Sequence, residues 1–243
     1  MPRFFEQNIT KEQKIISLSA ENAHHASRVL RLAVSDEITV CDGEGTDFIC
    51  SISHIASGEV EAQVLDVHPS ETEPTIKAHL FQGIAKGDKM DTIIQKAVEL
   101  GATEITPFFS SRCIVKLDEK DKAKKRERWQ KIALEAAMQS QRGIIPKINL
   151  PIFFSDAIKE LTKCDFSVIL YECEEKLRLT SEALAEARSV GFMVGPEGGF
   201  DASEVRMAQE KGAYSVTLGK RILRTETAPL CALSVIMHIT GNI

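Results

Sequence analysis

The sequence lacks the features that would place the protein in a membrane or on a secretory route. Its 243 residues are 43% hydrophobic, which supports a sizeable core, but they contain no run of about 18 apolar residues. The first residues, Met1 to Glu6, form no apolar signal region. We therefore expect a cytoplasmic protein without a membrane span.

Metal-binding and disulfide patterns are also missing. None of the 6 cysteines are spaced as Cys-x-x-Cys, and no pair of histidines has a zinc-binding spacing. We expect reduced, mostly buried thiols and no metal ion. Internal repeats and low-complexity segments are absent as well.

The familiar phosphate-cradling motifs do not occur. There is no Gly-x-Gly-x-x-Gly after a first strand and no Gly-x-x-x-x-Gly-Lys-Ser/Thr. A different glycine-rich segment, Gly195-Pro196-Glu197-Gly198-Gly199, carries an acid and lacks the lysine and hydroxyl that hold phosphates and Mg²⁺. It suits a ligand without phosphates, such as one that carries positive charge.

Two segments near the end of the chain are predicted strand-to-helix turns, Val194 to Phe200 and Leu218 to Pro229. Each follows an apolar, β-prone run and leads into a helical pattern. We expect both turns at the carboxyl ends of adjacent strands, the edge where open α/β sheets bind ligands. Asp201 and Glu204 form a capping-box pattern at the start of the next helix. A plain tight turn is the alternative explanation of the glycines.

The first 70 residues contain short alternating runs rich in β-branched residues. These runs cover residues 37–40, 46–54 and 59–67, and polar turns at 42–45 and 57–59 separate them. The pattern is typical of a small antiparallel barrel or meander, with a helical segment from Ala20 to Leu32. The polar segment from His68 to Pro74, with two prolines, is the predicted linker to a second domain.

Strands and helices alternate from Ile76 to the end of the chain. The predicted strands are 76–84, 104–109, 147–150, 166–171, 190–194 and 214–218, and the predicted helices are 88–100, 121–141, 155–161, 180–188, 202–211 and 226–240. This alternation predicts a mostly parallel sheet covered on both faces. Ser155 is the predicted cap of its helix. The last helix is apolar nearly all round, which predicts burial in the core or between subunits.

The net charge of −5 is distributed unevenly along the chain. Residues 1–75 hold 5 basic and 13 acidic side chains, residues 76–142 hold 14 and 9, and residues 143–243 hold 11 and 13. The positive middle segment suits a polyanion such as RNA. A solvated helix face is the alternative explanation for its charge run.

These motifs resemble the signature of the bacterial 16S ribosomal RNA (uracil-N3) methyltransferases, knotted SPOUT-class enzymes that use S-adenosylmethionine. The resemblance is carried by GPEGGF at 195–200 and LGKRILRTETAP at 218–229, and it extends to 24–31, 86–88, 95–101, 111–113 and 135–142. It implies a PUA-like RNA-binding β-barrel over residues 1–70. It also implies an α/β methyltransferase domain over residues 76–243, with a mostly parallel sheet and a deep trefoil knot. The knot comes from the resemblance alone, because ordinary topology rules predict an unknotted sheet.

The resemblance implies that S-adenosylmethionine binds across the two glycine turns and a third loop. The implied cofactor-binding residues are Leu170, Tyr171, Val194, Gly195, Pro196, Glu197, Gly198, Gly199, Leu218, Gly219, Ile222, Leu223, Arg224 and Thr225. Adenine would lie among apolar side chains and bond to loop backbone groups. Ordinary core packing is the alternative for Leu218, Ile222 and Leu223.

Arg224 and Glu226 are the candidate catalytic residues. N3 of a neutral uracil carries a proton, so the enzyme must remove that proton or favour the ionised base, and hold the nitrogen in line. Arg224 would stabilise negative charge on the base oxygens, and Glu226 would act as a general base if burial makes it more basic. A structural Arg224–Glu226 pair or a helix N-terminal acid is the alternative.

The candidate RNA contacts are seven cations in or near the matching motifs. Any one of them alone is more often a solvated surface charge, so the prediction rests on the set. They are Arg3, Arg28, Arg31, Lys86, Lys89, Arg112 and Arg142. The acidic balance of residues 1–75 departs from what an RNA-binding barrel needs. We expect a homodimeric enzyme acting on the 16S RNA of the small ribosomal subunit. The alternatives are a SPOUT methyltransferase for another RNA, such as a tRNA, and a non-catalytic ribosome-assembly factor that binds RNA.

Overall fold

The computed structural model describes residues 1–56 and 58–243, so the turn predicted at 57–59 lies partly outside the described residues. The chain divides into two compact units. One contains Met1–Glu73 and Ala137–Ile145, and the other contains Pro74–Ala136 and Pro146–Ile243. The sequence carried no signal that residues 137–145 return to the first unit.

The first unit is built on a five-stranded sheet in the order β1-β3-β4-β5-β2. Its strands are β1 (Arg3–Phe5), β2 (Ile15–Ser17), β3 (Glu37–Cys41), β4 (Thr46–Ala56) and β5 (Glu59–Pro69). The predicted meander is present as antiparallel β3, β4 and β5, while β1 pairs parallel to β3. Strands β1 and β2 were not predicted, because three residues are too few to show an alternation. Helix α1 (Ala20–His24) continues into a π-helical turn, η1 (His25–Val29), where the sequence predicted one helix.

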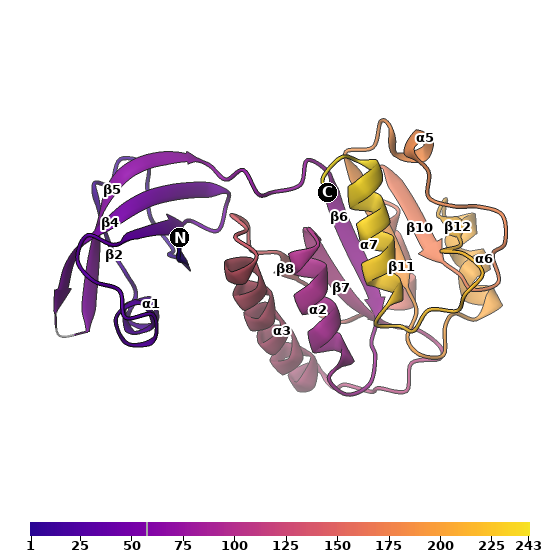
Figure 1. The fold of residues 1–243 in the computed structure, drawn as a ribbon. Helices are drawn as coiled ribbons and strands as arrows, with labels where there is room; N and C mark the ends of the chain where they lie inside the picture. Colours follow the sequence, from indigo (N-terminus) through magenta and orange to yellow (C-terminus); the bar gives the residue numbers. More distant parts are fainter. Residues whose placement is uncertain (57) are drawn as a thin grey trace. The chain divides into compact units, whose positions relative to one another are not determined.

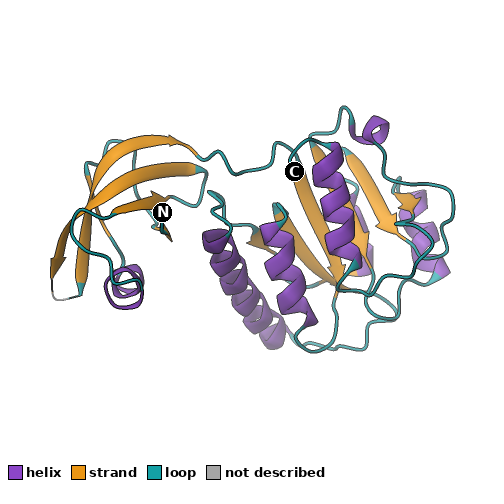
Figure 2. Ribbon diagram, viewed as in Figure 1, coloured by secondary structure: helices purple, strands orange, loops and turns teal. Residues whose placement is uncertain are grey.

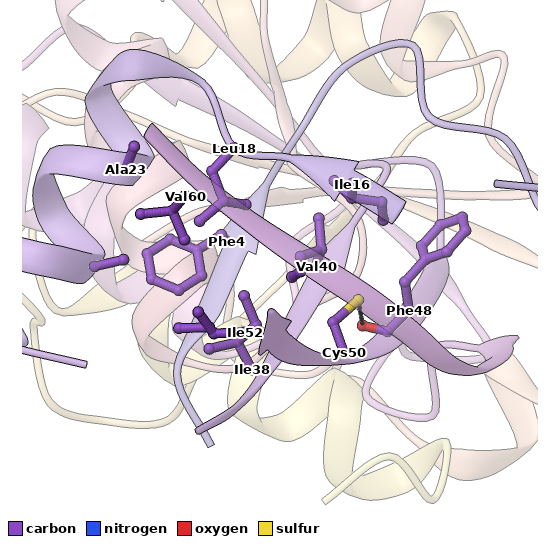
Figure 3. Packing of buried hydrophobic residues seen from close by; sticks show 12 residues of the cluster. Phe4, Ile16, Leu18, Ala23, Ile38, Val40, Phe48, Cys50, Ile52 and Val60 are labelled. Carbon is purple, nitrogen blue, oxygen red and sulfur yellow. Dashed lines mark hydrogen bonds between the residues drawn. The ribbon is translucent and has the colours of Figure 1, made fainter. Parts of the chain in front are cut away.

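The core of the first unit follows from the alternation along its strands. Figure 3 shows Phe4, Ile38 and Ile52 close together, with Phe48 farther along the same cluster, and each of the four is at most 1% exposed. Burying one such side chain stabilises a fold by about 1.5–3 kcal/mol. The inward positions of β1, β3 and β4 therefore hold this unit together.

Residues 137–145 are attached to the first unit by Glu73. Its carboxylate accepts hydrogen bonds from Arg142 at 2.6 Å, from the backbone N–H of Gly143 at 2.9 Å and from that of Ile144 at 3.0 Å. A partly buried carboxylate with several donors is a strong local anchor.

The second unit confirms the predicted parallel sheet. Its strands are β6 (Lys77–Gly83), β7 (Glu104–Phe109), β8 (Lys147–Ile148), β9 (Ile152–Phe153), β10 (Phe166–Leu170), β11 (Ser189–Val194) and β12 (Tyr214–Val216). The order is β12-β10-β11-β6-β7-β8, with β9 pairing β7, and every pair is parallel. All carboxyl ends therefore meet at one edge.

Helices cover both faces of this sheet, as predicted. They are α2 (Lys89–Glu99), α3 (Glu119–Gln139), α4 (Phe154–Leu161), α5 (Ser181–Leu184), α6 (Ala202–Glu210) and α7 (Ala228–Ile239). Figure 1 shows α2 and α7 side by side on one face, and Arg128 of α3 pairs with Asp91 of α2. Figure 2 shows the strands of the sheet with the helices around them. On the other face α4 and α6 pack in a core with Phe81 and Phe108.

Two local predictions about these helices were wrong. Phe153 is the N-cap residue of α4, so Ser155 lies in the first helical turn and does not cap it. Helix α5 spans only Ser181–Leu184, capped by Thr180, although the pattern predicted a helix to residue 188. In α6, by contrast, Asp201 and Glu204 form the predicted capping box.

The prediction that the two glycine turns follow adjacent strands was also wrong. Strand β10 lies between β11 and β12 and pairs with both. Consecutive strands are usually neighbours, but here the chain passes over β10 to reach the sheet edge. It then returns through residues 217–227 to α7, which packs on α2, β6 and β11. The trefoil knot expected from the resemblance stays a prediction.

Candidate active site

A pocket with a cavity volume of about 460 Å³ opens at the carboxyl ends of β10, β11 and β12. Its lining comes from three segments, 170–172, 194–200 and 216–225, with Lys89 and Ala228 beside them. Every residue that the sequence analysis assigned to cofactor binding lines this pocket. Inserting β10 between the other two strands thus brings all three loops to one place.

The first turn needs its glycines for steric reasons. A Cβ atom on Gly195 would lie 3.0 Å from the carbonyl carbon of Gly199. Gly199 has φ +65°, and a Cβ there would lie 2.5 Å from Oε1 of Glu172. A side chain at 195 would therefore press on the backbone of the turn, and one at 199 would be strained by the positive φ even if the Glu172 carboxylate moved aside. Phe200 then enters the core, with its ring stacked 6.2 Å from that of Phe108.

The carboxyl end of β6 packs against the first turn, a contact that the sequence did not predict. A Cβ atom on Gly83 would lie only 2.5 Å from the backbone nitrogen of Pro196. The adjacent Gln82 is fully buried, and its Nε2 donates to Oγ1 of Thr225 at 3.1 Å. The Thr225 hydroxyl in turn donates to the carbonyl of Gly195 at 2.7 Å. Both turns are thus connected to the end of β6.

The second turn is more open than the first. Ile222 is 86% exposed, Arg224 is exposed, and Leu218 and Leu223 are half-buried. Gly219 has φ +111°, a conformation that favours glycine. Among the described residues Arg224 forms no ion pair, so its guanidinium is available to a ligand.

Lys89, at the start of α2, links the two turns electrostatically. Its Nζ lies 3.2 Å from Oε1 of Glu197 and 3.3 Å from Oε2 of Glu226. The hydrogen bond to Glu197 is the main reason that the pKa of Lys89 is raised. Burial alone would raise the pKa of Glu197, but the N–H groups of Lys86 and Glu197 and the Lys89 ammonium together lower it.

These contacts bear on two expectations. Glu197 shares the Lys89 ammonium with Glu226, so the three groups together keep one net negative charge, which is compatible with the cationic ligand that the sequence suggested. Glu226 pairs with Lys89, and an Arg224–Glu226 pair does not occur in the part of the chain that the structure describes.

Sequence reasoning missed several residues of the pocket. They are Lys89 as a lining residue, Glu172, Phe200, Val216, Thr217, Lys220, Arg221 and Ala228. Glu172 directly follows Tyr171 at the end of a strand, so the rule that ligands bind at carboxyl ends would have found it. Lys89 had no such signal, because it comes from a different βα unit.

The candidate RNA contacts divide into buried and exposed cations. Arg3 forms a buried bidentate pair with Asp47 at 2.6 and 2.7 Å, and Arg142 is buried against Glu73. These two arginines hold the first unit together, so their surroundings do not suit RNA contact. The exposed candidates are Arg28, Arg31, Lys86 and Arg112.

Arg112 does not line the pocket, but it contacts the first turn. Its guanidinium donates to the carbonyl of Gly198 at 3.0 Å and to Asp201 at 3.3 Å. A Cβ atom on Gly198 would lie 3.0 Å from that of Arg112. The arginine therefore lies across the outer side of the first turn.

Metal ligands and membrane helices were both sought in the described ranges. No group of three or more His, Cys, Asp or Glu side chains is placed to hold a metal in residues 1–56 and 58–243. No helix within these ranges is long and apolar enough to span a membrane. The cysteines are unpaired, but only Cys41 and Cys50 are buried and Cys173 is exposed, so burial is less general than predicted. Burial raises the pKa of Cys41 to about 12 and that of Cys50 to about 11.

Two protein-family models match most of the chain. A family model for an RNA methyltransferase domain matches residues 71–237, and one for an RNA methyltransferase PUA domain matches residues 18–65. The chain belongs to this RNA methyltransferase family. The resemblance, the α/β fold class, the PUA-like first domain and the assignment as an enzyme are thereby confirmed.

Relatives in this methyltransferase family match nearly the whole chain. Ribosomal RNA small subunit methyltransferase E of Bacillus subtilis is 37% identical over 99% of this chain and 97% of its own length. The protein of that name from Aquifex aeolicus is 33% identical, with 87% and 89% covered. The Neisseria gonorrhoeae enzyme of that name, solved with S-adenosyl methionine, is 34% identical with a TM-score of 0.87, with 98% and 97% covered. A Legionella pneumophila methyltransferase, also solved with this cofactor, is 31% identical with a TM-score of 0.84, with 97% and 96% covered.

Proposed function

We propose that this enzyme transfers a methyl group from S-adenosylmethionine to N3 of a uridine in the 16S RNA of the small ribosomal subunit, in the cytoplasm. The observation that carries the proposal is the pocket in which every residue assigned to the cofactor comes together. The relatives with bound cofactor and with names specifying small-subunit ribosomal RNA support it. The choice of N3 comes from the family resemblance.

The pocket fits a nucleoside with a charged tail. Its volume of about 460 Å³ lies within the usual range for small-ligand sites, about 300–1,000 Å³. Leu170, Leu218, Ile222 and Leu223 offer apolar surface to adenine, and the glycine turns let backbone groups approach closely. Binding there would cover the exposed Ile222. Bound S-adenosylmethionine supplies the methyl group and leaves as a neutral thioether.

The protein groups then act on the uracil. Methyl transfer to N3 displaces the N3 proton and places negative charge on the base oxygens before the new bond is complete. We assign Arg224 to those oxygens, since its guanidinium is exposed beside the pocket and has no carboxylate partner within the described chain. Glu226, whose carboxylate lies 3.3 Å from the Lys89 ammonium, is the candidate proton acceptor.

RNA binding is assigned to the exposed cations of both units, Arg28, Arg31, Lys86 and Arg112. Arg3, Arg142 and Lys89 are engaged with carboxylates and are left out of this set. Because phosphate contacts release counterions, RNA affinity should fall steeply with salt. An affinity that stays flat between low and physiological salt would count against this assignment.

The homodimer is proposed from α7. One face of this helix is buried in its own chain, through Leu233 and Ile236, whereas Leu230, Val235 and Ile239 are only half-buried. A half-exposed apolar stripe fits a second copy of the same face. Val235→Glu should give monomers on size exclusion, while Met207→Glu on the exposed face of α6 should remain dimeric.

The decisive experiment is methylation of purified small subunits and of naked RNA, followed by identification of the product nucleoside by mass spectrometry. We expect N3-methyluridine in 16S RNA. Methylation of tRNA would favour a different RNA target. A protein that binds RNA but shows no heat on titration with S-adenosylmethionine would favour the non-catalytic assembly factor.

A further inference from the structure

We propose that Gln82 and Lys89, which flank the connection between β6 and α2, are positioning residues that set the distance between the two cofactor-binding turns. This inference rests on the proposed binding of S-adenosylmethionine. Both residues come from a segment that lies outside the two glycine turns in the sequence. Lys89 contacts a carboxylate on each turn, and Gln82 contacts Thr225 of the second turn, which in turn donates to the first.

Gln82 forms the inner contact. It pairs in register with Val194, the last residue before the first turn, so its side chain starts at a fixed height in the sheet. Its Nε2 lies 3.0 Å from the carbonyl of Gly83, 3.1 Å from Oγ1 of Thr225 and 3.4 Å from the carbonyl of Gly195. An amide nitrogen has two hydrogens, so the two shorter contacts take them. The contact to Thr225 is the one that reaches the second turn.

Thr225 completes the inner contact by donating to the carbonyl of Gly195 at 2.7 Å. The donor direction is unambiguous, because that carbonyl only accepts, and the hydroxyl then has lone pairs free for Gln82. The chain of contacts therefore runs from β6 to the second turn and on to the first. Gln82 and Thr225 are 0% and 6% exposed, so water does not compete for these bonds.

Lys89 forms the outer contact. Its ammonium group bridges Glu197 of the first turn and Glu226 of the second, at 3.2 and 3.3 Å. The Lys86 backbone N–H also donates to Glu197 at 3.0 Å. These groups are partly exposed, so this contact should be weaker than the buried one and sensitive to salt.

A glutamine here is not what fold stability alone would select. Leu80 and Phe81 in β6 and Ile84 just after the strand are apolar and buried, and a buried amide must lose its hydration. Its Oε1 also finds no hydrogen-bond partner among the described residues. A methionine would fill similar space without that cost. The donor at this position therefore indicates a role in placing the turns.

The test compares Gln82→Met with wild type by calorimetric titration with S-adenosylmethionine and by thermal melting. Losing the donor should weaken cofactor binding about tenfold. The melting temperature should stay within about 3 °C. In turnover assays KM for the cofactor should rise about tenfold, while kcat at saturating cofactor falls less than about threefold. Cofactor affinity within about twofold of wild type would overturn the role of Gln82.

Thr225 provides a second test that does not depend on how Gln82→Met folds. Thr225→Ser keeps the hydroxyl and should bind the cofactor within about threefold of wild type. Thr225→Val keeps the shape without the hydroxyl and should bind about tenfold more weakly. Equal affinities in the two variants would overturn the inner contact.

Lys89→Gln and Lys89→Arg test the outer contact. Removing the charge should weaken cofactor binding about threefold to fivefold at low salt, and the arginine should recover most of that loss. Equal affinities of Lys89→Gln and wild type at low salt would overturn the role of Lys89. The control for the loss of an amide at Gln82 is Asn149→Leu. This variant removes an amide whose nitrogen donates to Glu104 and Thr106 of β7. Its cofactor affinity should not change.

The same titrations separate this inference from the proposed function. If wild-type protein gives no heat with S-adenosylmethionine, the proposed function fails. If wild type binds and the Gln82, Thr225 and Lys89 variants bind equally well, only the positioning role fails.

Discussion

The two turns that line the pocket differ in how tightly the protein holds them. The first turn is packed on backbone: Gly83 touches Pro196, Gly195 touches Gly199, and Phe200 is buried in the core. The second turn carries the exposed Ile222 and Arg224. The rigid turn provides shape, and the open turn provides the groups that meet the ligands. Binding sites commonly combine a preorganised part with a more adaptable one.

Removing the guanidinium of the open turn should have the largest effect on catalysis. Arg224→Ala should lower kcat about 10²–10³-fold with cofactor saturating, as expected for loss of a donor to developing negative charge. Arg224→Lys should recover only part of the rate, because an ammonium cannot replace the planar fork. Arg206→Ala on α6 is the matched arginine control. Methylation of ribosomal RNA at the wild-type rate by Arg224→Ala would remove this residue from the mechanism.

Crowding the rigid turn should have the next largest effect. A methyl group in Gly83→Ala would overlap the backbone of Pro196, so the first turn must shift, and cofactor affinity should fall at least about tenfold. Gly212→Ala, between α6 and β12, meets open space but has φ +97°. It should lower stability by about 1 kcal/mol and leave cofactor affinity unchanged. Similar affinities for the two variants would contradict the idea of a backbone-packed turn.

Releasing the outer side of the rigid turn should have a moderate effect. Arg112→Ala removes the hydrogen bond to the Gly198 carbonyl and the ion pair with Asp201. Cofactor affinity should fall about threefold, because these contacts are partly exposed. RNA affinity should fall as well, and its salt dependence should become less steep. RNA binding with an unchanged salt slope would show that Arg112 serves only the turn.

The smallest effect is expected at the exposed apolar residue of the open turn. Ile222 is 86% exposed, so Ile222→Ser should leave the melting temperature within about 1 °C. It should weaken cofactor binding about threefold, through lost apolar contact with the adenine. A large drop in melting temperature would mean that this side chain supports the fold rather than the ligand.

Much of the site followed from local sequence. The glycines at 195 and 199 indicated close backbone approach, Asp201 and Glu204 indicated a capped helix, and the βα alternation indicated a parallel sheet. Each signal involves residues a few positions apart, whose geometry depends mainly on their own backbone. Short elements such as β1 and β9 carried too few residues to give such a signal.

The contacts that complete the site join residues far apart in the chain. Gln82 donates to Thr225, and Lys89 pairs with both Glu197 and Glu226. Arg3 pairs with Asp47, and Arg142 pairs with Glu73. A single sequence contains no record of which distant charges pair, so surface cations and buried ones look alike in it.

The sequence by itself determined the family, the fold class, the two glycine turns and most of the residues that line the pocket, because each depends on local pattern. Only the tertiary structure decided that β10 separates β11 from β12, and that the end of β6 and the start of α2 brace both turns. Strand order and long-range pairing are chosen by how whole elements bury their surfaces against one another. That choice depends on the complete fold and is not written in any one segment.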